Sequence, residues 1–260
     1  METIVNVFAE NLFKDKSVLI TGGGRGIGKE IALSFARLGA DVAIASRNKE
    51  NLEATKKEIK DMGQRCLALP TNIRDIEHVD SMVEHAIDGL GKIDFLINNA
   101  GGQFPAKPLD ISDNGWRSVV DLNLNGTWNV TNRVGRHMVE NEFGAIVNIV
   151  HIYSYNRGSP NFAHSGAARA GVVNLTKSLA YNWAKHNVTI NSLAPGTIDT
   201  EALHEYNVPE FLDTKGIPAK RLGEQDEVAA LCAFLCSPAA RYINGTDIIM
   251  DGGNFIKSMW

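Results

Sequence analysis

The chain has 260 residues, of which 44% are hydrophobic, and its 26 Lys and Arg against 30 Asp and Glu give a formal net charge of -4. This length suits one α/β domain with a substantial core, and the scattered charges form no basic stripe of the kind that binds nucleic acids. No apolar run approaches the roughly 20 residues of a membrane span, so we expect a small-molecule partner, no nucleic acid and no membrane.

The cysteines and the sequences at the two ends of the chain help to predict the cellular compartment of the protein. Cys66, Cys232 and Cys236 have no paired zinc-type spacing, and an odd number of cysteines suits a reducing compartment. Residues 1–11 lack the basic segment of a secretion or import signal, and Lys257–Trp260 differs from the peroxisomal Ser-Lys-Leu ending. The expected location is the cytoplasm, and no catalytic metal is expected.

Short apolar runs rich in Val and Ile alternate with longer segments of helical period. In chain order the runs are Ser17–Thr21, Val42–Ser46, Cys66–Leu69, Ile93–Asn98, Ala145–Val150, Thr189–Ser192 and Asp247–Met250. Such alternation is typical of strand-helix-strand units, and runs that are apolar throughout indicate strands buried on both faces. We therefore predict an α/β fold, a single-domain doubly wound Rossmann sheet of about seven parallel strands with helices on both faces. Residues 1–13 are expected to be an extension, 14–260 the domain, and the stretch near 197–218 a substrate loop.

A glycine-rich turn joins the first predicted strand to a helix. Residues Thr21–Gly28 read Thr-Gly-Gly-Gly-Arg-Gly-Ile-Gly, and the next segment has an apolar face through Ile31, Phe35 and Leu38. Glycines let the backbone approach a pyrophosphate, which then meets the N-terminal amides of the helix. The pattern predicts a dinucleotide site. Its expected residues are Gly22, Gly24, Arg25, Gly26, Ile27 and Gly28.

The residues after the second predicted strand bear on the choice of dinucleotide. The sequence there is Ser46-Arg47-Asn48, where an NAD-binding protein would usually place a carboxylate for the ribose hydroxyls. A carboxylate would repel a 2'-phosphate, whereas Ser46, Arg47 and Arg25 offer donors to one. NADP is therefore favoured over NAD.

Together these motifs resemble the short-chain dehydrogenase/reductase family from about Lys14 to Gly253. Asn98–Gly101 matches the family's Asn-Asn-Ala-Gly motif, Asn123 its active-site asparagine, and Pro195-Gly196 with Thr200 its Pro-Gly-x-x-x-Thr segment. The resemblance implies further cofactor contacts and, commonly, a homotetramer. The implied contacts are Asn72 and Ile73 at the adenine, and Asn99, Ala100, Gly101, Pro195, Gly196, Ile198 and Thr200 elsewhere along the cofactor.

Two residues depart from the family pattern. Ser165 and Arg169 stand where the family has its catalytic tyrosine and lysine. A ketone reductase must give a proton to an oxygen, so it needs a donor tuned toward neutral pH. An enoyl thioester collects charge on its carbonyl oxygen, where hydrogen-bond donors lower the barrier. The substitution therefore favours reduction of a carbon-carbon double bond.

The closest likeness within the family is to 2,4-dienoyl-CoA reductases and peroxisomal trans-2-enoyl-CoA reductases of fatty acid metabolism. It rests on Ala163–Val172, on Ile217–Gly223 and on the run from Phe234 to Gly245. The resemblance implies an NADPH-dependent reductase of a 2-enoyl-CoA or 2,4-dienoyl-CoA thioester. Acyl chain length, double-bond position and the identity of the carrier stay open.

The same resemblance suggests which side chains assist at the thioester. Gln103 lies where dienoyl reductases carry an asparagine beside the thioester oxygen, and their tyrosine lies in the loop after the fifth strand. An ungapped alignment puts that tyrosine on Ser154, so Tyr153 and Tyr155 both remain candidates, with Tyr153 slightly preferred. In this mechanism one of them donates to the thioester oxygen together with Gln103.

The remaining candidates have supporting roles. Arg169 is expected to bind the nicotinamide ribose and to stabilise negative charge, because arginine stays protonated. Asn123 is expected to hold a water or helix backbone. Ser165 is expected either to donate to a substrate or cofactor oxygen or to cap the following helix. His164 is expected at a loop or interface.

Two alternatives remain open from the sequence. One is a carbonyl reductase or alcohol dehydrogenase with a relocated acid, in which His151 and Tyr153 form a rebuilt pair. The other is a noncatalytic NADP-binding protein that acts as a sensor or as a subunit of an assembly.

Overall fold

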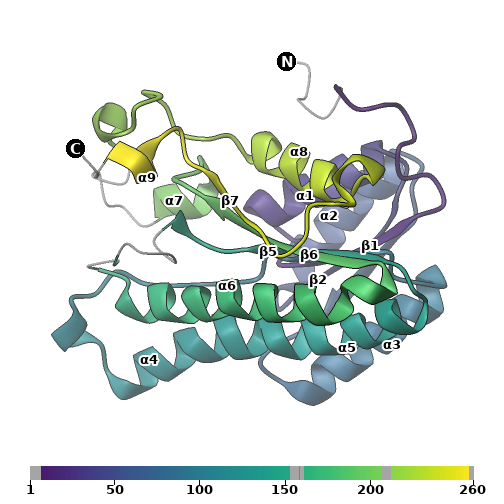
Figure 1. Ribbon diagram of the computed structural model, residues 1–260, viewed down its shortest axis with the longest axis horizontal. Helices are drawn as coiled ribbons and strands as arrows, with labels where there is room; N and C mark the ends of the chain where they lie inside the picture. Colours follow the sequence, from purple (N-terminus) through teal and green to yellow (C-terminus); the bar gives the residue numbers. More distant parts are fainter. Residues whose placement is uncertain (1–6, 153–157, 159–160, 206–211, 258–260) are drawn as a thin grey trace.

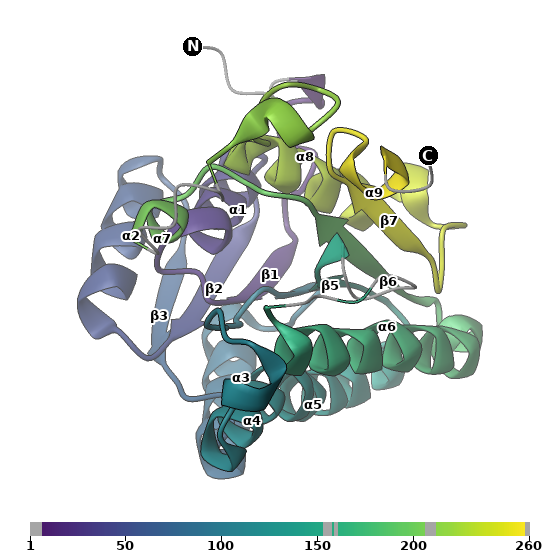
Figure 2. The ribbon, with the colours of Figure 1, turned by 90° about the vertical axis from the view of Figure 1, so that its left-hand side faces the viewer.

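The structure is a computed structural model that describes residues 7–152, 158, 161–205 and 212–257. Within these residues seven strands form one parallel sheet in the order β3-β2-β1-β4-β5-β6-β7 (Figures 1 and 2). The strands are β1 (Ser17–Thr21), β2 (Asp41–Ser46), β3 (Cys66–Pro70), β4 (Phe95–Asn98), β5 (Gly144–Ile149), β6 (Val188–Pro195) and β7 (Asp247–Met250). Every predicted run overlaps one of these strands, and the doubly wound α/β fold is confirmed.

Helices cover both faces of the sheet, as Figure 1 shows. One face carries α1 (Gly26–Arg37), α2 (Lys49–Asp61) and α8 (Gln225–Cys236); the other carries α3 (Ile76–Leu90), α4 (Asp113–Val120), α5 (Gly126–Glu140) and α6 (Ala163–Trp183). A π-helical turn, Asp121–Asn125, joins α4 to α5, while the short helices α7 (Glu201–Glu205) and α9 (Asn254–Lys257) follow β6 and β7. The predicted substrate loop therefore contains a short helix.

Alternate residues of the central strands enter two different cores. In β1, Val18 and Ile20 belong to the core beneath α1 and α8, whereas Leu19 belongs to the core beneath α3 and α5. In β4, Phe95 and Leu96 divide in the same way. Successive side chains of a strand point to opposite faces, so a strand covered on both sides must be apolar throughout. This packing explains the uninterrupted apolar runs of the sequence.

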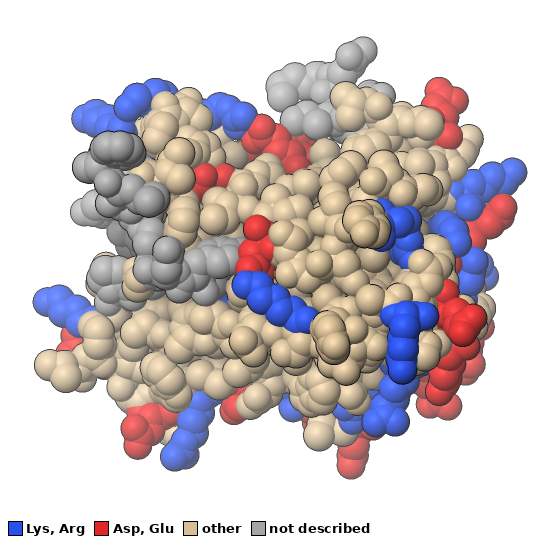
Figure 3. Space-filling model, in the orientation of Figure 1, with Lys and Arg blue, Asp and Glu red and all other residues tan. Residues whose placement is uncertain are grey.

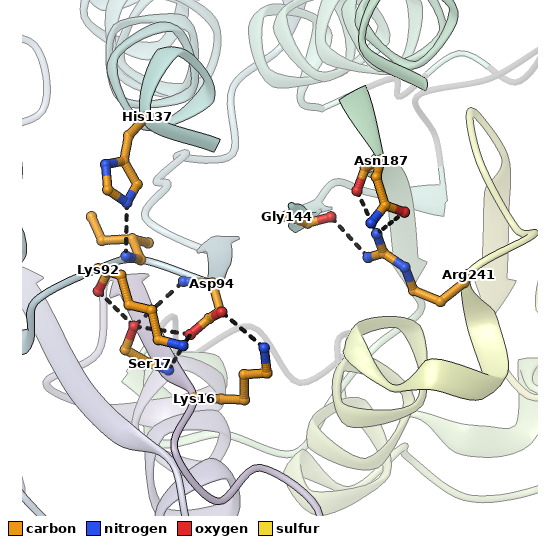
Figure 4. Close-up of polar contacts among 9 residues, drawn as sticks. Lys16, Ser17, Lys92, Asp94, His137, Gly144, Asn187 and Arg241 are labelled. Carbon is orange, nitrogen blue, oxygen red and sulfur yellow. Dashed lines mark hydrogen bonds and ion pairs between the residues drawn. The ribbon is translucent and has the colours of Figure 1, made fainter. Parts of the chain in front are cut away.

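Buried polar contacts hold the amino ends of the strands together (Figure 4). The Asp94 carboxylate accepts hydrogen bonds from the Ser17 amide at 3.0 Å and from Lys16 Nζ at 3.1 Å, and it lies 3.2 Å from Lys92 Nζ. Asp94 is only 4% exposed, so removing its partners would leave a buried charge, which is strongly destabilising. This edge of the sheet is therefore structural.

Charged side chains show no dominant sign on the face seen in Figure 3, where basic and acidic groups are interspersed over the surface. The mixture agrees with the scattered charges of the sequence. Among the described residues, no helix combines the length and the apolar character needed to cross a bilayer.

Candidate active site

A cavity of about 700 Å³ opens at the carboxyl ends of β1, β2 and β4. This is the edge where ligands bind in open α/β sheets, beside the point at which strand order reverses. Its walls are Gly22, Gly24, Arg25, Gly26, Ile27, Ala45, Ser46, Arg47, Asn48, Asn51, Thr71, Asn72, Ile73, Asn99, Ala100, Gly101, Leu122, Thr200 and Ala202. Most of the predicted cofactor residues thus line one cavity.

The glycine-rich turn forms the floor of this cavity. Gly22 and Gly26 have φ of +71° and +55°, in the left-handed region that favours glycine. A Cβ on Gly28 would overlap the carbonyl of Gly22, so α1 can approach the turn only because residue 28 is glycine. The residue before α1, Arg25, caps no backbone amide with its side chain, which leaves the first turn of the helix available to a pyrophosphate.

Two arginines and a serine gather at the adenosine end. Ser46 ends β2, Arg47 follows it, and Arg25 lines the same cavity. Arg47 forms no ion pair within the described part of the chain, whereas Arg25 pairs with Glu205 at 3.0 Å. Asn72, at the predicted adenine position, accepts a hydrogen bond from Arg74 Nε at 3.2 Å. The structure therefore brings the predicted 2'-phosphate donors together, and one of them already has an acidic partner.

At the opposite end of the cavity, Arg169 projects from α6. Its Nη1 donates to the carbonyl of Ile149, the last residue of β5, at 2.7 Å. A Cβ on Gly101 would overlap the Arg169 guanidinium and lie 2.7 Å from Asn123 Oδ1. The Asn-Asn-Ala-Gly motif, the active-site asparagine and the arginine at the lysine position therefore meet around one glycine.

Asn123 lies in the π-helical turn between α4 and α5 and is buried. Its Nδ2 donates to the carbonyls of Gly102 at 2.7 Å and Val119 at 2.8 Å, and its Oδ1 accepts from the Gly102 amide at 3.2 Å. The bond to Val119, four residues earlier, is a local contact with helix backbone, and the expected role of Asn123 in the site stays a prediction. The bonds to Gly102 were not anticipated, and they fix the loop that carries Gln103.

Ser165 is the third residue of α6 and is 1% exposed. The helix begins at Ala163, so the predicted helix-capping role of Ser165 is wrong because the residue lies inside the first turn. Its Oγ is buried without a hydrogen-bond partner in the described ranges. A donor role for Ser165 therefore stays a prediction that requires a ligand or a water to reach it.

His164 is completely buried, so the expectation of a loop or interface position is wrong. Its Nδ1 accepts the Ser165 amide hydrogen at 2.9 Å, and its ring meets Phe104 edge-on at a centroid distance of 4.6 Å. Burial lowers the pKa of His164, although the Phe162 backbone partly opposes the shift. The side chain therefore joins the start of α6 to the loop after β4.

Tyr153 and Tyr155, the two candidate donors, lie outside the described residues, as does Ser154. His151, just before them, is half-buried, and burial together with the charge of Arg169 lowers its pKa to about 3. The imidazole is therefore neutral near pH 7, where it can accept a proton or donate a hydrogen bond but carries no charge.

The Pro195-Gly196 segment ends β6 and leads to the cavity rim. The Gly196 amide donates to the Met250 carbonyl at 2.9 Å, and a Cβ on Gly196 would lie 2.8 Å from Cβ of Asp251. Thr200 lines the cavity, and its Oγ1 accepts from the Leu203 amide at 3.2 Å.

The sequence did not predict Asn51, Leu122 and Ala202 as cavity residues, because they reach the cavity only through the packing of their helices.

We expect the free energy of unfolding to fall as the pH drops from about 6.5 to about 5. His151 has a lowered pKa in the folded chain, so the unfolded chain binds the extra proton in this range and gains stability from it. The pKa values of half-buried His137 and buried His164 are lowered as well. Urea unfolding at several pH values measures the slope, and His151→Gln should flatten it; an unchanged slope would contradict the assignment.

We also expect the thiols to be inert in the native chain. Burial raises the pKa of Cys66 to about 12 and raises those of Cys232 and Cys236 well above their ordinary value. Only a thiolate attacks a disulfide reagent. Ellman's reagent at about pH 8 should therefore label all three cysteines in urea and leave them unlabelled in buffer; rapid labelling in buffer would show that a thiol is accessible.

No metal-ligand cluster of His, Cys, Asp and Glu occurs among the residues described.

Comparisons with known proteins identify the family of this chain. A family model described as enoyl-(acyl carrier protein) reductase matches residues 22–254. A probable 2,4-dienoyl-CoA reductase of Bacillus subtilis is 38% identical over 93% of this chain and 97% of its own length. The peroxisomal 2,4-dienoyl-CoA reductase of Rattus norvegicus is 38% identical over 96% and 87%.

A 3-oxoacyl-[acyl-carrier-protein] reductase of Staphylococcus epidermidis is 36% identical over 93% of this chain and 100% of its own. Among solved structures, a short chain dehydrogenase from Bacillus anthracis superposes with a TM-score of 0.85 and 40% identity, covering 93% of this chain and 97% of that one. These relatives match nearly the whole chain, and the solved structure shares its fold. The chain belongs to the short-chain dehydrogenase/reductase family of oxidoreductases, in the group that the enoyl-(acyl carrier protein) reductase model describes.

Proposed function

We propose that this protein is an NADPH-dependent reductase that transfers hydride to a conjugated carbon of a 2-enoyl-CoA or 2,4-dienoyl-CoA thioester. The observation that carries the proposal is the pairing of an intact cofactor cavity with Arg169 and a buried Ser165 at the positions of the family's Lys and Tyr. Arginine stabilises developing charge but is a poor proton relay. The relatives named 2,4-dienoyl-CoA reductases support the same choice.

The choice of NADPH rests on the adenosine end of the cavity. Ser46, Arg47 and Arg25 line it, and the residues directly after β2 include no carboxylate that would repel a 2'-phosphate. Guanidinium groups bind phosphate through charge-assisted hydrogen bonds. Gly22–Gly28 and Thr200 would hold the pyrophosphate, and the backbone near Ile198 would meet the nicotinamide amide.

The bound dinucleotide would supply the hydride, and the protein would position and assist. Arg169, fixed by its bond to Ile149, would orient the nicotinamide ribose and keep positive charge beside the thioester. Asn123 would hold the Gly102 backbone and so set the position of Gln103. Gln103 with Tyr153 or Tyr155 would donate to the thioester oxygen, and water or the tyrosine would then protonate the enolate.

An NADPH-oxidation assay tests this proposal. The panel is crotonyl-CoA, a longer 2-enoyl-CoA, a 2,4-dienoyl-CoA and a set of ketones, with the last as the rival substrate class. We expect turnover of the unsaturated thioesters, and Tyr153→Phe beside Tyr155→Phe assigns the donor. Activity on ketones alone would overturn the proposal, and full activity of both tyrosine variants would remove the loop tyrosines from it.

A carbonyl reductase is the second candidate, because the staphylococcal relative is named a 3-oxoacyl reductase. In that reading His151 and Tyr153 would form the acid pair. The lowered pKa of His151, about 3, argues against it because a neutral imidazole cannot act as a charged acid near neutral pH. Tight NADPH binding without turnover of any substrate would instead favour a noncatalytic sensor.

We further propose a cytoplasmic homotetramer that uses CoA as the acyl carrier. The tetramer rests on the family resemblance, and the carrier on the names of the dienoyl-CoA relatives. Light scattering measures the assembly. Replacing CoA with acyl carrier protein in the same assay measures the carrier preference, and faster turnover of the protein-bound thioester would reverse that choice.

A further inference from the structure

The guanidinium of Arg25 is held by a carboxylate at the mouth of the cofactor cavity. Its Nη1 donates to Glu205 Oε1 at 3.0 Å and to Oε2 at 3.2 Å, across 180 positions of sequence. The two side chains are 53% and 60% exposed, so solvent and ligands reach both. Arg25 also lines the cavity itself. One partner of this exposed ion pair is therefore part of the wall of the cofactor cavity.

The carboxylate comes from the far end of α7. The start of this segment is tied to the body, because the Asp199 amide donates to the Gly223 carbonyl at 2.8 Å and Gln225 Nε2 donates to the Asp199 carbonyl at 2.9 Å. From there α7 runs toward the beginning of α1, as Figures 1 and 2 show. Glu205, the last residue of α7, then meets Arg25. The pair thus connects two walls of the cavity.

The two arginines at the adenosine end of the cavity differ in how freely they can bind a phosphate. Arg47 has no ion-pair partner in the parts of the chain that are described, whereas Arg25 already faces a negative charge. A 2'-phosphate that approaches Arg25 meets a guanidinium that is partly neutralised and a carboxylate that repels it. A cofactor without that phosphate presents only a ribose hydroxyl there and meets no such repulsion.

We propose that Glu205 modulates coenzyme preference: it competes with the 2'-phosphate of NADPH for Arg25 and so weakens NADPH binding relative to NADH. The inference rests on the proposed binding of NADPH at Ser46, Arg47 and Arg25. When the phosphate takes Arg25, the far end of α7 loses its bond to α1. Binding of NADPH, but not of NADH, therefore breaks the contact between Glu205 at the end of α7 and Arg25.

Coenzyme binding to the full chain, followed by nicotinamide fluorescence without any acyl substrate, tests this inference. Glu205→Gln should tighten NADPH binding about threefold at low salt, which is the range for losing one exposed charge interaction, and should leave NADH unchanged. Arg25→Gln should weaken NADPH binding by about tenfold and abolish the effect of Glu205→Gln in the double variant. Glu201→Gln removes the same charge from the other end of α7 and is the matched control.

Several results would overturn the role of Glu205. One is weaker NADPH binding by Glu205→Gln, and another is an equal change in NADH and NADPH affinity. The role is also excluded if Glu205→Gln still tightens NADPH binding in the double variant with Arg25→Gln, or if Glu201→Gln tightens NADPH binding equally. Tighter binding of NADH than of NADPH by the unaltered chain would instead count against NADPH as the coenzyme of the proposed reductase. The comparison of Glu205→Gln with the double variant still decides the role of Glu205 in that case.

Discussion

Replacing Arg169 with methionine is expected to lower kcat for a 2-enoyl-CoA by about 100-fold or more, because in the proposed mechanism Arg169 supplies a fixed charge beside the thioester oxygen. Methionine has a similar length but no donor, so it gives up the bond from Nη1 to the Ile149 carbonyl as well as the positive charge. Steady-state kinetics with NADPH and crotonyl-CoA measure the change. The loss should appear in kcat and in kcat/KM alike, since the interaction strengthens as charge develops on the substrate.

Arg169→Lys is the matched control for this variant. It retains a cation at the position where the family usually has lysine, and we expect it to stay within about tenfold of the unaltered chain, the loss reflecting the forked geometry that lysine lacks. A methionine variant with unchanged kcat would remove Arg169 from the mechanism. A fall in thermal stability that matches the fall in activity would indicate a structural role instead.

The second large effect is expected for Gly28→Ala, which should abolish measurable coenzyme binding and lower the free energy of unfolding by about 3 kcal/mol. The added Cβ would overlap the carbonyl of Gly22 and the side-chain amide of Asn99, so α1 must move away from the turn. That movement displaces the amides that would face the pyrophosphate. NADPH fluorescence titration and urea unfolding measure the two consequences separately.

Gly63→Ala serves as the control for a methyl group added without collision. Gly63 has φ of +85°, and a Cβ there meets nothing within 4 Å. It should lose only about 1 kcal/mol from backbone strain and should keep full coenzyme affinity. Equal coenzyme affinity of Gly28→Ala and the unaltered chain would show that the turn does not hold the pyrophosphate.

The cofactor half of the site was predictable because its signals are local. Gly22–Gly28 must follow a strand and begin a helix, and both conditions can be read within a dozen positions of sequence. Ser46 and Arg47 lie at the end of the next strand for the same reason, and parallel strands bring their carboxyl ends to one edge. The cavity walls confirm where these residues lie, although they do not test which coenzyme binds.

The reacting half was less predictable because its contacts join residues that are distant along the chain. Nothing near Asn123 in the sequence indicates that its amide holds the Gly102 backbone, since that bond depends on how the π-helical turn packs against the loop after β4. The sequence predicted a loop or interface position for His164. Its burial beneath Phe104 arises from the position of that loop.

By itself the sequence determined the strands, their two-sided burial and the phosphate turn, because strand period, helix period and glycine spacing are properties of neighbouring residues. Only the tertiary structure decided that Arg25 pairs with Glu205, that Arg169 is fixed by Ile149, and that Ser165 is buried. These outcomes depend on which side chains meet when helices and loops from distant parts of the chain pack on a common sheet, and no local pattern encodes such meetings.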